Sequence, residues 1–173
     1  MNARFAHYNL VSARDVLERL GIRPFLVDGT LLGAIREGDF IGHDTDVDLG
    51  IWRSEWRAWI IPHLTQHGFN LHKVYGDLDR GLQYSFKRRK IKLDLFFYYD
   101  DGDVVYHAAW KNGQPIRYPY ARFDLKRLAF RGAVFWAPAD PVRFLETKYG
   151  PEWRTPVKEW DWAWGPKNAE AWR

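Results

Sequence analysis

The sequence predicts an α+β fold, in which helices pack on a mixed β-sheet within one domain spanning residues 1–173. Helix-like and strand-like segments alternate along the first half of the chain, a pattern typical of parallel strand pairing. In the second half, strand-like segments are joined by short turn sequences typical of antiparallel hairpins. No internal repeat, low-complexity tract or linker divides the chain, and 173 residues are enough to bury a substantial core. We therefore expect a single compact domain with a mixed sheet flanked by helices.

Composition excludes several classes of protein. The chain has no cysteine, which rules out disulfides, thiolate zinc sites and a cysteine nucleophile. Charged residues interrupt the first twenty positions, so no secretory signal is expected there. No apolar run approaches the roughly 20 residues that span a bilayer. We expect a soluble cytoplasmic protein that is not an integral membrane protein.

The elements of the first half are predicted from hydrophobic period, caps and breakers. They are a helix at 8–20, a strand at 25–27, a turn at Asp28-Gly29-Thr30, a helix at 31–36 and a strand at 46–51. A further helix is expected to begin at Ser54 and to contain Trp56, Trp59 and Ile60. Pro62 would kink or restart this helix, and Gly68 would end it.

The second half is expected to be mostly strands. The predicted elements are strands at 82–87 and 91–98 joined around Arg88-Arg89, a turn at Asp101-Gly102 before a strand at 104–107, a turn at Asn112-Gly113, a strand at 133–136, a helix with Asp140 as N-cap, Pro141 first and Gly150 as its stop, and an irregular tail.

Carboxylates alternate along the predicted strand at 46–51. Asp44, Asp46 and Asp48 fall on one face, because alternate residues of a strand share a face. Stacked like charges repel each other, and a bound cation would relieve the repulsion. A solvated strand face is the alternative. An EF-hand loop with Glu55 at its last position is a weaker one, because Leu49 stands where that loop needs glycine.

A third carboxylate, Asp94, is the one acidic residue of the strand-like segment KIKLDLFFYY. A carboxylate in so apolar a strand is costly unless it is paired or bound to metal. With Asp46 and Asp48 it could hold one or two Mg²⁺ or Mn²⁺ ions, which bridge phosphate oxygens during phosphoryl transfer. An ion pair with Lys92 or Arg89 is the alternative.

Other residue patterns leave two interpretations open. Gly29 and Thr30 precede a predicted helix, so their backbone N–H groups and the Thr30 hydroxyl could hold a phosphate, or they could form only a tight turn. The basic run 87–90, followed by Lys92, could bind an anionic ligand or be a solvated hairpin tip. Tryptophans at 153–164 could pack the protein or stack on a sugar or base. The six histidines show no ligand spacing.

Several ordered motifs carry a family resemblance. DGTLLGAIR at 28–36, GDFI at 38–41, HDTDVDLGI at 43–51 and LDLF at 93–96 together resemble the signature of the LicD/fukutin family of the nucleotidyltransferase superfamily. The similarity continues through residues 123–130 and the closing pattern from Pro141 to Pro156. It implies a nucleotidyltransferase-like fold and an enzyme that transfers a phospho-alcohol, such as phosphocholine or ribitol phosphate.

The resemblance also implies ligands and site residues. The donor would be CDP-linked or another nucleotide, and the acceptor a hydroxyl group of a glycan. Asp46 and Asp48 would be the principal metal ligands. Asp94 would be the third ligand and the candidate general base for the acceptor hydroxyl. Residues carried over with lesser roles are Asp44, which would assist the metal, and Gly29, Thr30 and Arg36, which would hold the donor phosphates.

Two other functions compete with phospho-alcohol transfer. One would use the same three carboxylates, and the other would use none of them. A true nucleotidyltransferase would move NMP from an NTP to a small molecule such as an antibiotic, to tRNA or to a protein, with the same three carboxylates. A non-catalytic binding module would not need them. The sequence has no aromatic–basic signature of an RNA-binding module, so nucleic acid is not an expected partner.

Overall fold

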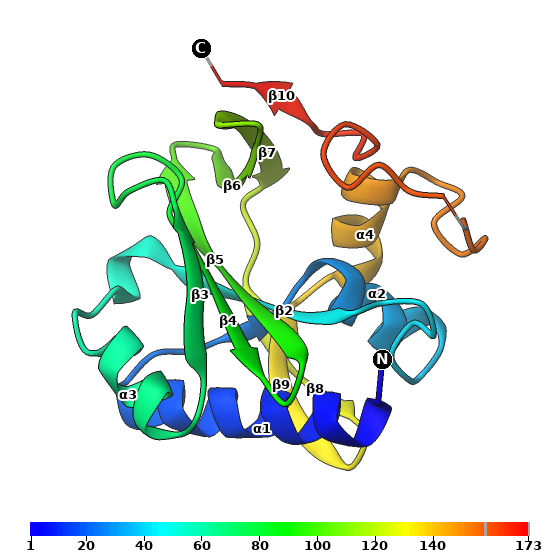
Figure 1. Cartoon of the computed structure of the whole chain (residues 1–173). Coiled ribbons are helices and arrows are strands. Elements are labelled where there is room, and N and C mark those ends of the chain that lie inside the picture. Colours follow the sequence, from blue (N-terminus) through cyan, green and yellow to red (C-terminus); the bar gives the residue numbers. More distant parts are fainter. Residues whose placement is uncertain (158, 173) are drawn as a thin grey trace.

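The computed structural model describes residues 1–157 and 159–172, and Figure 1 shows a twisted sheet with helices on both sides. The helices are α1 (Ala3–Arg19), α2 (Asp28–Arg36), the short 3-10 helix η1 (Arg53–Glu55), α3 (Ile60–Gln66) and α4 (Pro141–Tyr149). The strands are β1 (Phe25–Leu26), β2 (Asp46–Trp52), β3 (Asn70–Tyr75), β4 (Gln83–Arg88), β5 (Ile91–Asp101), β6 (Val104–Lys111), β7 (Gln114–Ala121), β8 (Leu125–Phe130), β9 (Ala133–Pro138) and β10 (Glu170–Ala171).

The sheet is mixed, as the sequence predicts. Its main order is β10-β7-β6-β5-β2-β1-β9-β8, and β4 and then β3 branch from the first half of β5. Strands β2 and β5 pair in parallel, as do β1 and β9, whereas the other pairs are antiparallel. The parallel β2–β5 pair lies at the centre of the sheet and carries the candidate site residues.

Helix ends follow from local capping. Helix α1 starts at Ala3, earlier than predicted, because the Asn2 side chain accepts a hydrogen bond from the Phe5 N–H. Helix α4 begins as predicted, with the Asp140 side chain accepting from the Arg143 N–H. Gly150 ends it with a φ of 82°, a conformation that glycine adopts without strain.

Two predicted turns are placed differently. Residues 28–30 are the first turn of helix α2 rather than a turn before it, because the Leu31 N–H already donates to the Val27 carbonyl. The β4–β5 hairpin turns at Arg89 and Lys90, one residue later than predicted. Both residues have positive φ, the geometry of a tight hairpin turn.

Two further elements differ from the prediction. The helix expected to contain Trp56 and Trp59 starts only at Ile60, with Pro62 in its first turn, where proline is tolerated. Strand β8 was not predicted, because its exposed side chains lack an alternating pattern. The tail is irregular as expected, apart from the short β10.

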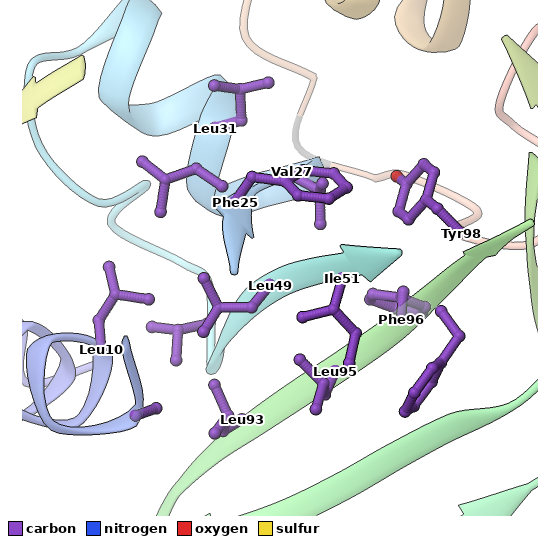
Figure 2. Close-up of a cluster of buried hydrophobic side chains, with 14 of the residues drawn as sticks. Leu10, Phe25, Val27, Leu31, Leu49, Ile51, Leu93, Leu95, Phe96 and Tyr98 are labelled. Atoms are coloured by element: carbon purple, nitrogen blue, oxygen red, sulfur yellow. The ribbon is translucent and has the colours of Figure 1, made fainter. Parts of the chain in front are cut away.

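The core lies on both sides of the central strands. Figure 2 shows Leu10 of α1 and Leu31 of α2 on opposite sides of β2. Leu49 and Leu93 are fully or almost fully buried within the same core cluster. None of the helices described is long and apolar enough to cross a membrane.

Gly50 lets an aromatic ring pack directly on β2. A Cβ atom at Gly50 would lie 2.5 Å from Phe25 Cε2 and 2.9 Å from Tyr98 Cε2. Both rings are buried, and their centroids are 5.1 Å apart. The sheet therefore depends on the missing side chain at this position.

We expect Gly50→Ala to lower the free energy of unfolding by about 1–3 kcal/mol, because the methyl group overpacks the core. Gly42→Ala is the matched control, since a Cβ atom there meets nothing within 4 Å. Urea unfolding of the three proteins measures the difference. Equal stability of Gly50→Ala and wild type would contradict the packing described.

Candidate functional site

A cavity of about 770 Å³ opens on the side of β2 and β5 that faces α2. Its floor carries Asp46, Asp48 and Asp94, and residues of α2, α4, β6, β7 and the C-terminal tail form its walls. The cavity thus joins residues from the whole length of the chain.

Strand pairing brings the three predicted carboxylates together. Asp48 and Asp94 are register partners in the parallel β2–β5 pair, and Asp46 lies two residues earlier on the same face. One carboxylate oxygen of each residue lies within 4.8 Å of the others. Residues that the sequence places 46 positions apart therefore form one cluster; metal binding by it remains a prediction.

The cluster is electrostatically strained. Burial, followed by the charges of Asp46, Asp28 and Asp94, raises the pKa of Asp48 well above its ordinary value. Burial also raises the pKa of Asp94, with Lys92 partly opposing it. Asp94 Oδ1 is buried and has no hydrogen-bond partner in the described part of the chain. Oxygen donors with this much mutual repulsion suit a hard divalent cation such as Mg²⁺ or Mn²⁺.

Lys92 partly neutralises the cluster. Its Nζ lies 3.0 Å from Asp46 Oδ2 and 3.0 Å from Asp94 Oδ2. Burial acts to lower the pKa of Lys92, but Asp94 and Asp46 outweigh this effect and raise it. The ion pair between Asp94 and Lys92, one of the alternatives left open by the sequence, is therefore present, whereas Arg89 stacks instead on the rings of Phe5 and Tyr8.

The absence of a side chain at Gly29 leaves room for the carboxylates of Asp44 and Asp48. A Cβ atom at Gly29 would lie 2.8 Å from Asp44 Oδ2 and 3.4 Å from Asp48 Oδ2. Asp44, which precedes β2, thus reaches the cavity beside the cluster, and burial followed by the charge of Asp46 raises its pKa. The predicted contact between the Gly29 backbone and a phosphate stays a prediction.

Thr30 and Arg36 differ in their position relative to the cavity. The Thr30 hydroxyl accepts a hydrogen bond of 2.8 Å from the Asp48 N–H, and the residue is only 1% exposed. It holds β2 against α2 and is not among the residues that line the cavity; its expected contact with phosphate stays a prediction. Arg36 does line the cavity, held by Glu37 and the Trp153 carbonyl.

The cavity also contains a buried ion pair that the sequence motifs do not predict. Lys148 of α4 contacts the carboxylate of Asp28, and both line the cavity. Burial acts to raise the pKa of Asp28. The charges of Lys148 and His107, with a hydrogen bond from Lys148, outweigh burial, so that the pKa is lowered overall. The spacing of Lys148 from Phe144 and Leu145 could have indicated a buried lysine, because these three residues share the buried side of α4.

His107 lies among aromatic rings next to this pair. Its ring stacks on Tyr118 with centroids 5.0 Å apart, and it is 1% exposed. Burial is the largest of the effects that lower its pKa to about 3; Lys148 acts in the same direction and Asp28 opposes it. His107 is therefore a neutral residue of the cavity wall.

The tail supplies an aromatic wall. Trp153 is buried, and it lines the cavity together with Trp160 and the half-exposed Trp162; the ring centre of Trp160 lies 5.2 Å from that of Tyr149. Trp164 is also about half exposed but does not line the cavity. Stacking of these tryptophans on a sugar or base stays a prediction.

Comparison with known proteins gives consistent matches. The family model described as LicD/FKTN/FKRP, nucleotidyltransferase domain, matches residues 21–140. Human ribitol-5-phosphate transferase FKTN is 32% identical over 161 residues, covering 91% of this chain and 35% of FKTN. Human ribitol 5-phosphate transferase FKRP is 37% identical over 146 residues, covering 79% of this chain and 29% of FKRP. The chain spans about a third of the length of these relatives.

A solved structure shares the fold. The antibiotic-resistance factor ANT(2'')-Ia superposes with a TM-score of 0.55 at 13% identity, over 92% of this chain and 78% of that chain. The expected nucleotidyltransferase-like fold is confirmed.

We expect Lys92→Met to destabilise the metal-free protein by about 1–2 kcal/mol, because Asp46 and Asp94 lose their cation. Mn²⁺ should stabilise this variant more than wild type, since no ammonium competes for the carboxylates. Thermal unfolding with and without Mn²⁺ measures this, with the exposed Lys126→Met as control. The absence of stabilisation by Mn²⁺ in both Lys92→Met and wild type would argue against a metal site here.

The buried imidazole predicts a pH effect on stability. Between the ordinary pKa of about 6.5 and the lowered value of about 3, the unfolded chain binds a proton that folded His107 does not. Stability therefore falls as pH falls through this range. From pH 7 to pH 5, urea unfolding should show wild type losing about 2 kcal/mol more than His107→Phe. Equal losses would show that His107 is not held neutral.

Proposed function

Since the chain belongs to the LicD/FKTN/FKRP nucleotidyltransferase-domain family, we propose that it transfers a phospho-alcohol from a CDP-linked donor to a hydroxyl group of a glycan. Ribitol phosphate and phosphocholine are the candidate groups, and the ribitol-5-phosphate transferases FKTN and FKRP support the first. The observation that carries the proposal is the convergence of Asp46, Asp48 and Asp94 in the cavity.

In this proposal the three carboxylates would hold Mg²⁺ or Mn²⁺, with Asp44 assisting, and the metal would supply positive charge for the phosphate oxygens of the donor. Asp46 and Asp48 suit this role because they share a strand face and need a counter-charge. Lys92 contributes a second positive charge beside the same carboxylates.

Asp94 is the candidate base. The acceptor hydroxyl attacks the phosphorus next to the alcohol, its proton passes to Asp94, and the bond to CMP breaks. A carboxylate with a raised pKa accepts a proton more readily near neutral pH. Asp94 Oδ1 has no hydrogen-bond partner within the described residues, and this supports its role as the oxygen that accepts the proton.

The cavity walls would hold the rest of the donor. The backbone of Gly29 and the guanidinium of Arg36, which both line the cavity, would bind phosphate oxygens beside the carboxylates. Trp160 and Trp162 would stack on the base or sugar of the nucleotide.

Metal-dependent nucleotide binding tests the site. Calorimetry with CDP and Mn²⁺ should show binding to wild type that Asp46→Asn weakens at least tenfold, because the metal loses a ligand. Asp79→Asn is the matched control, since that side chain is 99% exposed. Equal affinity of Asp46→Asn and wild type, or no binding in the presence of metal, would contradict the site assignment.

Product identity tests the reaction. Incubation with CDP-ribitol, CDP-choline, CDP-glycerol and the four NTPs should give CMP from one of the CDP-alcohols in the presence of acceptor. Pyrophosphate release from an NTP would instead assign the chain to nucleotidyl transfer. Absence of either product with intact nucleotide binding would support a binding module.

A further inference from the structure

Two aromatic side chains are exposed on α1, beside the turn between β4 and β5 (Figure 1). Phe5 is 39% exposed and Tyr8 is 48% exposed, and their spacing of three residues places them on one side of the helix. Single exposed rings are common in folded proteins, but neighbouring exposed rings form an apolar patch that a partner can cover. This side of α1 is therefore a candidate interaction surface.

Two arginines of the β4–β5 hairpin contact these rings. The Arg88 guanidinium lies 4.8 Å from the ring centre of Tyr8 and 4.8 Å from that of the buried Phe69. The Arg89 guanidinium lies 4.7 Å from the ring centre of Tyr8 and 5.2 Å from that of Phe5. Cation–π attraction stabilises this arrangement. The hairpin is thus attached to α1 and does not end in a simply solvated tip.

The positive charge around the two rings is not compensated. Arg4 of α1 and Arg89 and Lys90 of the hairpin turn are all exposed. Residues 1–14 and 80–93 contain no Asp or Glu. Within the described residues, no carboxylate forms an ion pair with any of these three cations. An anionic partner would relieve the repulsion among them.

The rings and the cations form one continuous surface, because the arginines of the hairpin contact the rings of α1. We call this surface the basic aromatic patch, and its residues are Arg4, Phe5, Tyr8, Arg88, Arg89 and Lys90. The patch lies near the carboxylate cluster. Lys92, two residues after Lys90, contacts Asp46 and Asp94, and two residues of a strand span about 7 Å.

The chemistry of the patch favours an anionic membrane surface over a strand of nucleic acid. Basic side chains are attracted by anionic lipid headgroups, and aromatic rings settle at the level of those headgroups. Single-stranded RNA would instead be bound by stacking of its bases on ring faces. Arg88 and Arg89 already lie over the rings of Tyr8 and Phe5, so these faces are less available to bases.

We propose that the basic aromatic patch docks the protein on an anionic membrane surface. Its arginines and its lysine contact lipid phosphates, while the rings of Phe5 and Tyr8 lie among the headgroups. This docking goes beyond the proposed transfer reaction and does not depend on it, since neither metal nor donor takes part. It also holds the carboxylate cluster close to the membrane, because Lys90 and Lys92 are only two residues apart.

Co-sedimentation of the full chain with lipid vesicles tests the charges of the patch. Wild type should sediment with vesicles of phosphatidylcholine and phosphatidylglycerol in equal parts, but not with vesicles of phosphatidylcholine alone. Arg4→Gln/Lys90→Asn should bind the mixed vesicles about tenfold more weakly, because two cations are lost. Asparagine tolerates the positive φ of 64° at position 90. The matched control Arg57→Gln/Lys126→Gln removes two exposed cations elsewhere and should bind like wild type.

A second variant tests the rings while keeping every charge. Phe5→Gln/Tyr8→Gln should also bind the mixed vesicles about tenfold more weakly, and added NaCl should abolish what binding remains, because only screened charges then hold the protein. Trp59→Gln is the control, since Trp59 is 62% exposed and lies outside the patch. Thermal unfolding shows whether each variant is folded, and the charge variant decides the question if the ring variant is not.

Three results would overturn the inference. The first is equal sedimentation of wild type with the two kinds of vesicle. The second is equal binding by Arg4→Gln/Lys90→Asn and its control. The third is release of the protein from mixed vesicles by single-stranded RNA at an equal concentration of phosphate groups, which would assign the basic aromatic patch to nucleic acid.

Discussion

The parallel pairing of β2 with β5 is the constraint on which the rest of the structure depends. Its register sets Asp48 beside Asp94 and Asp46 beside Lys92 in the middle of the sheet. Like charges placed this way repel, and burial makes the repulsion stronger because water screens it less. The surrounding residues therefore have to supply positive charge and hydrogen bonds. Thr30 also helps to fix the pairing, by accepting a hydrogen bond from the Asp48 N–H.

Two cations from the second half of the chain meet this requirement. Lys92 contacts the cluster from β5 itself, and Lys148 contacts Asp28 from α4. The second ion pair also joins α2 to α4, two walls of the cavity. The sequence has nine basic against eleven acidic residues in 1–86 and seventeen against eleven in 87–173. Folding brings these halves together, so part of this uneven charge becomes ion pairs and part becomes the exposed surface of β3 and β4.

The cavity is lined by residues from inside and from outside the segment that matches the family model. Residues 21–140 match the nucleotidyltransferase-domain family and contain all three carboxylates of the cluster. Lys148, Trp153, Trp160 and Trp162 lie beyond that segment, yet they line the same cavity. The tail reaches the cavity because Lys167 donates its backbone N–H to the Lys148 carbonyl.

Sequence alone determined the mixed sheet, the strand at 46–51 and the three carboxylates, because strand period and helix caps are local properties of the chain. It could not determine which cations face them. Strand register and helix packing between distant segments decided that Lys92 pairs with the cluster, that Lys148 pairs with Asp28, and that the Thr30 hydroxyl turns inward. The basic run at 87–90 shows the same limit, since only its pairing with β5 separates Lys87 from the arginines beside it.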